Sequence, residues 1–278
     1  MTFLQSILLG FVQGATEFLP VSSSGHLAVL TNIFGVKEGN LFFAEMLHLG
    51  TLLSVGVVFR KRIRKLIVEF LHYCKKIVRT RNFSFENAYQ KLSILLIVSA
   101  IPAGLVGVFL SDFIESIFTK LYMVGIGFLI TGCMLFFVGH MPGGERGPRE
   151  MTFIDALFAG IMQSIAILPG ISRSGSTIGA LLIRKLNRKL ATEFSFLMSL
   201  IPIFGAALLG IIKAVKNPMA TIELNFSLLA GVLTSFVVGV LAIGMMVRLL
   251  REKKLYYFSY YLIPLGIFAI FADLVGIA

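Results

Sequence analysis

The sequence predicts an all-α integral membrane protein whose two halves are inverted-topology repeats, each with a re-entrant helical hairpin and three transmembrane helices. The 278 residues are 57% hydrophobic and only 14% charged, and their mean hydropathy of +0.91 is far above that of soluble domains. Apolar runs of about 20 residues, long enough to cross a bilayer as helices, recur along the chain. Two similar stretches lie about 150 positions apart, which indicates a duplication.

Six apolar runs are predicted to cross the membrane. They are residues 40–59, 92–111, 121–139, 191–212, 226–247 and 257–277. We expect all six to belong to a single membrane domain over residues 1–278, because no part of the chain has the composition of a separate soluble domain.

The two similar stretches share the order of their landmarks. They are VQGATEFLPVSSSGHLAVL (12–30) and MQSIAILPGISRSGSTIGALL (162–182). Each has a glutamine, an apolar helical stretch, Leu-Pro, a serine-rich turn with Ser-Gly, and a second apolar stretch. Pro20 and Pro169 are offset by 149 positions.

A glutamate in the following apolar run recurs at nearly the same offset. Glu45 and Glu193 lie 148 positions apart. Similar offsets at separate landmarks favour duplication over chance. We therefore expect repeat 1 to cover about residues 1–139 and repeat 2 about residues 151–278.

The segments on either side of each Leu-Pro are too short for a full crossing. In the first half they are about residues 3–18 and 23–34, and in the second about 152–168 and 174–185. Each pair is interpreted as a re-entrant hairpin that returns to its own side, because irregular backbone is tolerated at membrane depth only inside protein or beside water. Three full spans follow each hairpin. Because three is an odd number, the second repeat has the opposite orientation in the membrane to the first.

Basic residues are concentrated on one side of this topology. The stretch 60–91, with segments 140–150, 184–189 and 248–254, holds 20 of the 25 basic residues. The positive-inside rule makes that side cytoplasmic, so 60–91 is predicted to be a basic cytoplasmic loop with an amphipathic helix on the inner membrane surface. The first hairpin then opens outward, the second inward, and their tips approach near the midplane. This topology explains the net charge of +11, and no nucleic-acid partner is expected.

Several ionisable side chains lie within the apolar segments, where charge is costly and indicates function by default. They are Glu17, His26, Glu45, His48, Arg173 and Glu193. Glu17 and His26 lie in the first hairpin, which favours function over a buried structural role. Asp155 and Asp273 fall close to segment ends, where we expect water to reach them.

The repeat-related glutamates have two equally good interpretations. Glu45 and Glu193 either contribute to a functional site or lock spans to hairpins through hydrogen bonds. His48 lies one helical turn after Glu45. It is predicted to be structural or to support a functional neighbour.

The second hairpin has the composition of an anion site. In PGISRSGST, small residues allow close approach of a ligand, and the free N–H groups of a helix start attract anions. Arg173 can hold two phosphate oxygens at once. A buried arginine needs an anion, which is either Glu17 or a bound phosphate. A pair that only joins the hairpins would leave the surplus hydroxyls unexplained.

The two hairpin tips together are suited to a pyrophosphate. The side chains predicted to bind it are Gln13, Ser22, Ser24, Ser172, Ser174, Ser176 and Thr177. A site between membrane hairpins opens sideways to hydrocarbon, so the pyrophosphate is expected on a lipid. Phosphoryl transfer needs positioning, charge neutralisation and an oriented nucleophile, which this composition supplies.

The motifs resemble those of a known family, the bacterial undecaprenyl pyrophosphate phosphatases of the bacitracin-resistance type. QGATEFLPVSSSGH resembles its (E/Q)GxTEFLPVSS(S/T)GH signature, and PGISRSGST resembles its PGxSRSxxT signature. EFSFLMSLIP also agrees, and the resemblance covers essentially the whole chain. It implies an enzyme that hydrolyses undecaprenyl pyrophosphate to undecaprenyl phosphate and inorganic phosphate, which recycles the carrier lipid for cell-wall synthesis and confers bacitracin resistance.

The resemblance also implies a location and a cofactor. The protein is expected in the bacterial inner (cytoplasmic) membrane as a multi-pass protein, with its active site accessible from the external (periplasmic) side. A divalent cation, Mg²⁺ or Ca²⁺, is implied, with Glu17 as its ligand. Many members have Glu where this chain has Gln13, so Glu17 is the single carboxylate of the motif and a two-carboxylate metal site is not supported.

The resemblance implies functional roles at positions of both motifs. They are Glu17, Ser22, Ser23 and His26 in the first, and Ser172, Arg173, Ser174 and Thr177 in the second. Our mechanistic hypothesis is that Ser23 attacks the terminal phosphorus while His26 takes its proton, with Arg173 and Glu17 completing the catalytic set. Ser22, His26 itself and an activated water are the alternative nucleophiles.

Two other functions remain open from the residues. Inverted repeats with paired hairpins also build the substrate sites of secondary transporters, so a lipid-phosphate flippase or transporter would need the same anion site. A third possibility, a non-catalytic membrane assembly protein, would show neither phosphate release nor transport.

The sequence does not determine the oligomeric state, and a homodimer is possible.

Overall fold

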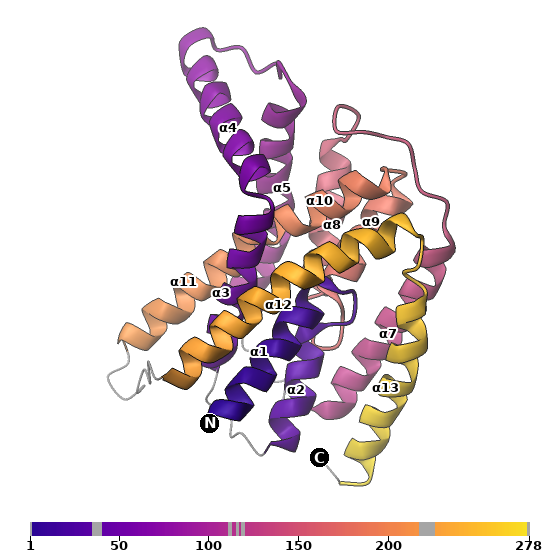
Figure 1. The fold of residues 1–278 in the computed structure, drawn as a ribbon. Coiled ribbons are helices and arrows are strands. Elements are labelled where there is room, and N and C mark those ends of the chain that lie inside the picture. The colour runs from indigo at the N-terminus through magenta and orange to yellow at the C-terminus, as the bar shows by residue number, and fades with distance from the viewer. Residues whose placement is uncertain are drawn as a thin grey trace.

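The computed structural model describes residues 2–34, 41–110, 113–114, 117, 120–216 and 226–276, and in these ranges every regular element is a helix (Figure 1). The helices are α1 Phe3–Phe18, α2 Ser23–Ile33, α3 Leu41–Val58, α4 Arg60–Thr80, α5 Ala88–Phe109, α7 Leu121–His140, α8 Phe153–Ile165, α9 Arg173–Ile183, α10 Arg188–Met198, α11 Leu200–Lys216, α12 Phe226–Arg251 and α13 Tyr257–Leu274. The all-α prediction is confirmed.

The membrane-crossing segments are close to those predicted. Five helical stretches are long and apolar enough to cross a bilayer: α5, α7, Arg188–Gly210, α12 and α13. The remaining predicted run, 40–59, forms α3, which bends by 82° into α4 and passes the same test only together with it. The chain is therefore a multi-pass membrane protein with five or six spans. The last residue of the predicted run 257–277 lies outside the described residues.

Two predicted segments are more irregular than their hydropathy indicates. The run 191–212 is divided where α10 ends at Met198 and α11 begins at Leu200. The basic loop 60–91 is mostly the single helix α4, which projects with the start of α5 beyond the other helices (Figure 1). An amphipathic helix in this loop was expected and is present.

Four helices that are too short to cross a membrane flank the two Leu-Pro turns. The helices α1, α2, α8 and α9 have 16, 11, 13 and 11 residues, whereas a crossing needs about 20. They form two consecutive pairs, α1 with α2 and α8 with α9, and each pair turns around a Leu-Pro. These are the segments in which the sequence predicts hairpins.

The helices approach closely where both carry small residues. A Cβ atom on Gly10 of α1 would collide with the backbone carbonyl of Gly231 in α12. A Cβ atom on Gly127 of α7 would likewise collide with the carbonyl of Pro169, in the turn before α9. Small residues allow such backbone contact between membrane helices. Gly127 thus fixes the second turn directly against a spanning helix.

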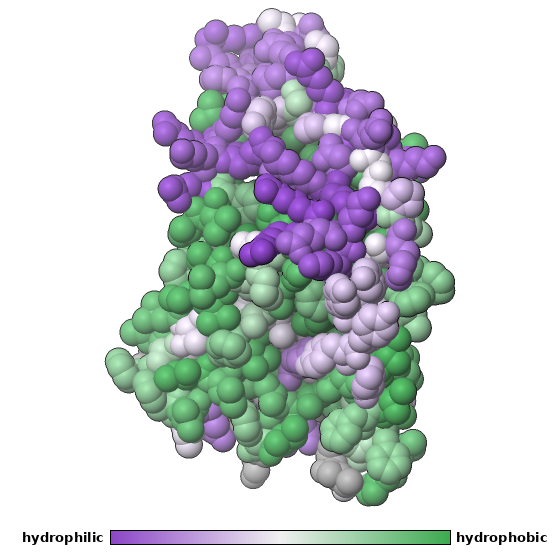
Figure 2. All heavy atoms as spheres, turned by 45° about the vertical axis from the view of Figure 1, so that its right-hand side comes forward, coloured by the Kyte–Doolittle hydropathy of each residue, from purple (hydrophilic) through white to green (hydrophobic). Residues whose placement is uncertain are grey.

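The surface has a polar end above an apolar body (Figure 2). Large apolar side chains are exposed around the spans, for example Phe109 at 77% and Phe137 at 67%. Such exposure is unusual in soluble proteins and is expected where lipid replaces water. The polar end contains α4 and the loop before α8 (Figure 1).

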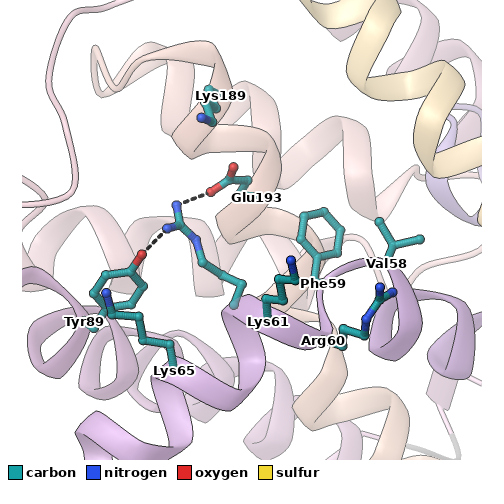
Figure 3. Close-up of a pocket in the computed structure, with 9 residues that line it drawn as sticks. Val58, Phe59, Arg60, Lys61, Lys65, Tyr89, Lys189 and Glu193 are labelled. Carbon is teal, nitrogen blue, oxygen red and sulfur yellow. Dashed lines mark hydrogen bonds and ion pairs between the residues drawn. The ribbon is translucent and has the colours of Figure 1, made fainter.

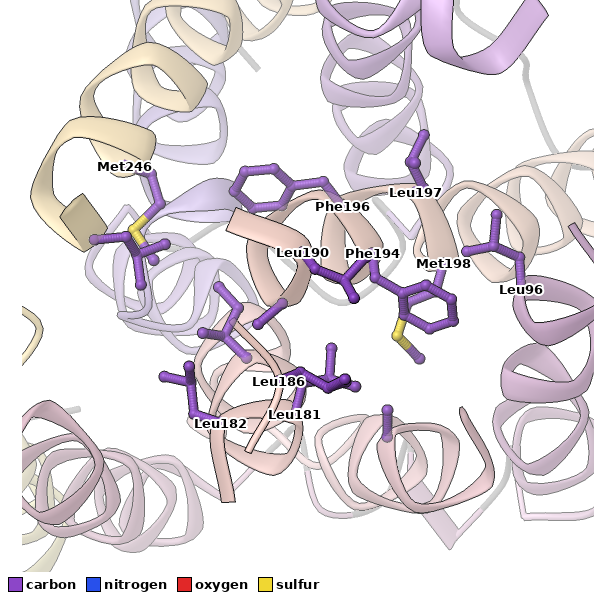
Figure 4. Packing of buried hydrophobic residues seen from close by; sticks show 14 of the residues in the cluster. Leu96, Leu181, Leu182, Leu186, Leu190, Phe194, Phe196, Leu197, Met198 and Met246 are labelled. Atoms are coloured by element: carbon purple, nitrogen blue, oxygen red, sulfur yellow. The ribbon is translucent and has the colours of Figure 1, made fainter. Parts of the chain in front are cut away.

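A cluster of buried side chains joins the two short helix pairs. Phe18, the last residue of α1, packs edge-on against Phe196 of α10 with ring centroids 5.4 Å apart. Leu181 of α9 and Met246 of α12 belong to the same cluster, part of which is drawn in Figure 4. Because Phe18 directly follows Glu17, this packing holds the Glu17 backbone beside α10.

The expectation that water reaches Asp155 is not met. The sequence placed this residue near a segment end within reach of water, but its carboxylate is fully buried. Its two oxygens accept from Arg146 Nη2 at 2.7 Å and Arg184 Nε at 2.6 Å. The expectation was wrong because the loop before α8 folds over the start of α8 and supplies one of the two arginines.

Candidate active site

The turns of the two short helix pairs lie against each other. Ser174 at the start of α9 donates its hydroxyl to the carbonyl of Leu19, 155 positions earlier, at 3.2 Å. Arg173 forms an ion pair with Glu17 through Nη2 and Oε1. The structure therefore brings together the two motifs that the sequence singled out.

Glu17 is the centre of this site. Its side chain is 4% exposed. Besides Arg173 on Oε1, its Oε2 accepts from Ser23 Oγ at 2.5 Å and from Gln13 Nε2 at 2.9 Å. His48 Nε2 lies 3.7 Å from the same oxygen. The carboxylate thus touches four polar side chains from four different helices or helix ends.

Both serine-rich turns end in helices with the same N-terminal cap. Ser22 Oγ accepts from the N–H of Gly25 at 3.3 Å, and Ser172 Oγ accepts from the N–H of Gly175 at 3.1 Å. Each cap leaves further backbone N–H groups of the first turn directed at the site. Ser22 has a φ of 68°, an uncommon conformation for a residue with a side chain, and such residues cluster at functional sites.

The His26 ring contacts a tyrosine of α13. Its Nδ1 donates to the carbonyl of Ser22 at 2.7 Å, which leaves Nε2 to accept from the hydroxyl of Tyr261 at 2.7 Å in the neutral ring. The ring stacks on Tyr261 and meets Phe128 edge-on. In this arrangement the base in contact with the Ser23 hydroxyl is Glu17. The catalytic role of His26 stays a prediction.

One residue beside the site agrees with its prediction and another was missed. His48 was predicted to be structural or supporting, and the packing of α3 on α1 brings it to Glu17. Tyr261 carries no local signal, because it lies on a spanning helix 235 positions from His26. Only the tertiary fold reveals such a contact.

The remaining predicted residues differ in the partners that they contact. Ser24 bonds Ser22 at 3.3 Å and stays with the first turn. Ser174 reaches across to the other turn, as described above. Thr177, in contrast, bonds Ser195 of α10 at 2.6 Å and the backbone of its own helix. Its hydroxyl therefore joins α9 to α10 in this structure.

Each repeat-related glutamate lies against a different helix. Glu193 pairs with Arg62 of α4 at 2.5 Å. Glu45 lies against Gly210 of α11, where a Cβ atom would collide with its carboxylate. The Glu193 pair joins α10 to α4, neither of which belongs to the two short helix pairs. The two interpretations of these glutamates stay open.

Several buried polar atoms of the site have no partner among the described residues. They are Gln13 Oε1, Arg173 Nη1 and Ser176 Oγ. A buried polar atom without a hydrogen bond costs about 1 to 3 kcal/mol, so such atoms point to a missing ligand or water. Arg173 Nη1 is a cationic donor and suits an anion.

The oxygen donors present fit a single divalent cation that also binds phosphate. No cluster of three or more His, Cys, Asp or Glu side chains occurs in the part of the chain that the structure describes, so an all-protein cage is not formed there. Magnesium instead commonly uses one or two carboxylates together with substrate phosphates and water. Glu17 supplies a carboxylate, and the unpartnered Oε1 of Gln13 supplies a neighbouring carbonyl oxygen.

Comparison with protein families settles the classification. The family model described as Bacitracin resistance protein BacA matches residues 6–268. The chain belongs to the BacA family. The predicted family is thereby confirmed, and the matched range includes Glu17, Arg173 and Tyr261.

Curated relatives within the BacA family are similar over almost their whole length. The undecaprenyl-diphosphatase of Alkaliphilus metalliredigens is 42% identical over 267 residues, which cover 96% of this chain and 97% of that protein. That of Carboxydothermus hydrogenoformans is 39% identical over 269 residues and 96% of each chain. That of Desulforapulum autotrophicum is 36% identical over 280 residues, with 99% and 100% covered.

Proposed function

We propose that the protein is an undecaprenyl-diphosphatase, which hydrolyses undecaprenyl pyrophosphate to undecaprenyl phosphate and inorganic phosphate. The observation that carries this proposal is the buried Glu17–Arg173 pair between two serine-capped helix starts, with Arg173 Nη1 still lacking a partner. Its relatives in the BacA family bear this enzyme name. The reaction recycles the carrier lipid for cell-wall synthesis and counters bacitracin, which sequesters the pyrophosphate form.

The membrane arrangement is part of the proposal. The two short helix pairs are re-entrant hairpins in two repeats of inverted topology, and the basic end that contains α4 faces the cytoplasm. Their short lengths and the distribution of basic residues support this arrangement. The protein then lies in the bacterial cytoplasmic membrane, and the lipid pyrophosphate enters from the external side.

Binding of the pyrophosphate uses the free donors of the site. Arg173 Nη1 and the N–H groups in the first turn of α9 hold phosphate oxygens, and Ser176 Oγ adds a hydroxyl. The positive end of a helix dipole favours the same charge. These groups neutralise the pyrophosphate without a separate soluble domain.

Ser23 is the proposed nucleophile, because its hydroxyl already donates to Glu17 Oε2. Its Oγ forms a bond to the terminal phosphorus as the bond to the bridging oxygen breaks, and its proton passes to Glu17. Undecaprenyl phosphate leaves. Water then hydrolyses the phosphoserine, which releases inorganic phosphate and restores the Ser23 hydroxyl.

A divalent cation completes the proposed site. Glu17 and Gln13 Oε1 would hold it together with the pyrophosphate oxygens. When bound, it neutralises negative charge on the phosphate oxygens. Phosphate release from a polyprenyl pyrophosphate by purified protein should therefore stop with a chelator and return with added Mg²⁺ or Ca²⁺.

The same assay tests the function itself. Purified wild-type protein in detergent, without any gradient, is expected to release phosphate, whereas Arg173→Ala and Glu17→Ala are expected to release none. A flippase or transporter predicts no release from any of the three proteins. Full phosphate release by both variants would show that neither Glu17 nor Arg173 is part of the active site.

The proton acceptor can be identified by rapid quenching. If Glu17 is the base, Glu17→Gln forms no phosphoserine, while His26→Asn still forms it in the first turnover. If His26 is the base, as the sequence hypothesis has it, His26→Asn forms none. Mass spectrometry of the peptide that contains Ser23 distinguishes the two results, and Ser23→Ala is the blank.

A further inference from the structure

A cavity of about 550 Å³ lies at the basic end, apart from the candidate active site. It is formed where the start of α4 faces α5 and α10 (Figure 3). Its lining residues are Val58, Phe59, Arg60, Lys61, Arg62, Lys65, Tyr89, Lys189 and Glu193. None of them belongs to the catalytic or pyrophosphate-binding set described above.

The cavity has a strong excess of positive charge. Five of its lining side chains are basic, and Glu193 is the single carboxylate among them. Glu193 is already paired with Arg62 at 2.5 Å. Arg62 also donates to the hydroxyl of Tyr89, and Figure 3 marks both bonds with dashed lines. The only lining anion therefore neutralises one of five cations.

The other cations have no counter-charge in the described part of the chain. Lys65 lies over the ring of Tyr89, with Nζ 4.2 Å from the ring centroid. Arg60 donates to the carbonyl of Val57 at 3.1 Å. Lys61 and Lys189 have no hydrogen bond or ion pair with any described residue. Cations gathered around one concave space raise its potential and attract an anion.

The position of the cavity indicates which kind of anion reaches it. It lies at the 82° bend where α3 leaves the apolar body and continues as α4. Val58 and Phe59, the last apolar residues before this bend, form part of its wall, and Val58 is 40% exposed. Basic pockets at this depth, with apolar residues on one side, suit the phosphate of a lipid headgroup whose chains remain in the bilayer.

We propose that this cavity binds the phosphate group of an anionic phospholipid in the leaflet at the basic end. Lys61 and Lys189 contact the phosphate from α4 and from α10, so the lipid joins the base of α4 to the helix that packs on α9. Free inorganic phosphate has the same charge chemistry, and the experiment separates the two sources. The proposal does not depend on the enzymatic function.

A single introduced tryptophan can report binding at this cavity by its fluorescence. The chain contains no tryptophan, so Val58→Trp introduces a single tryptophan at the cavity wall. Its fluorescence in neutral detergent is measured during titration with dihexanoyl phosphatidylglycerol, dihexanoyl phosphatidylcholine or inorganic phosphate. We expect a saturable change with phosphatidylglycerol and none with phosphatidylcholine. An equally tight response to inorganic phosphate supports the phosphate site and assigns the free anion as its ligand.

Matched charge variants test whether Lys61 and Lys189 bind the phospholipid. Lys61→Gln with Lys189→Gln is expected to weaken phosphatidylglycerol binding at least tenfold, since each basic residue near a membrane contributes severalfold. Lys75→Gln with Arg79→Gln removes the same charge from the far end of α4 and is expected to change binding less than twofold. Equal weakening by both pairs would overturn the proposal, as would no saturable response to either anion.

A second measurement avoids dependence on the tryptophan. Wild-type protein is purified with radiolabelled phosphatidylglycerol, washed with neutral detergent and counted for bound lipid. About one retained lipid per chain is expected for wild type and for the Lys75/Arg79 pair, and less than a tenth of that for the Lys61/Lys189 pair. Equal retention by all three would overturn the proposal.

Discussion

At the residue scale, the candidate site depends on how one buried carboxylate is shared. Glu17 Oε1 holds Arg173, while Oε2 faces Ser23, Gln13 and His48. Each oxygen therefore has a separate contact, because one pairs with Arg173, the proposed phosphate-binding residue, and the other accepts from Ser23, the proposed nucleophile. An ion pair that only joined two hairpins would not need the second set of contacts.

Arg173 is expected to require its guanidinium shape as well as its charge. Arg173→Lys keeps the charge but loses the planar fork that pairs with a carboxylate and an anion together. We expect phosphate release to fall by about 10² to 10³-fold, the usual loss when a donor to a reacting phosphate or oxyanion is removed. Arg251→Lys, on the exposed end of α12, is the control and should retain wild-type rates.

Tyr261 is expected to position His26. Tyr261→Phe keeps the ring that stacks on His26 but removes the hydroxyl at Nε2. We expect kcat to fall several-fold to tenfold with KM unchanged, since one neutral hydrogen bond contributes about 0.5 to 1.5 kcal/mol. Tyr260→Phe, its exposed neighbour, is the control. A rise in KM alone would place Tyr261 in lipid binding instead.

At the element scale, short helices and close backbone contacts position the site. The spans followed from the sequence because hydropathy and length alone determine them. The bend at Phe59 lies where the predicted run 40–59 gives way to the predicted basic loop. The break at Ser199 did not follow from the sequence, because it lies in an apolar stretch with no change of composition. The motif residues were also predictable, whereas Tyr261 and the approach of His48 depend on how spanning helices pack.

The buried ion cluster of Asp155 is expected to stabilise the start of α8. Asp155→Asn leaves Arg146 and Arg184 without their shared carboxylate, and removing one partner of a buried pair costs about 3 to 5 kcal/mol. A clearly lower midpoint of thermal unfolding in detergent is the expected result. Glu252→Gln, which removes an exposed pair, should change stability by about 1 kcal/mol or less. Equal midpoints for both variants would contradict this role.

At the scale of the whole molecule, charge and hydropathy define an orientation. The polar end with α4 and the apolar body are separate in Figure 2, and the basic residues gather at that end. The side of the membrane on which the end lies follows from the positive-inside rule and not from the fold. Orientation is therefore tested directly.

Cysteine labelling is the appropriate test of this topology. In a Cys74→Ser, Cys133→Ala background, Lys75→Cys on α4 and Lys120→Cys before α7 are each exposed. On whole cells, a membrane-impermeant maleimide should label the cysteine at 120 and should reach the one at 75 only after permeabilisation. Labelling of both positions from outside would contradict the proposed placement of positions 75 and 120 on opposite sides of the membrane.

The sharing of the site between two halves also bears on how the protein is made. In the predicted repeat, Gln13 is matched by Gln163 and Ser22 by Ser172, but Glu17 is matched by Ala166 at the offset of the Leu-Pro, and His26 by Ser176. The first half alone holds the acid, and the second half alone holds the arginine. During synthesis the first half enters the bilayer with a carboxylate that lacks its counter-charge. If the proposed site is correct, the nascent chain is expected to release no phosphate until its second half has been inserted and docked.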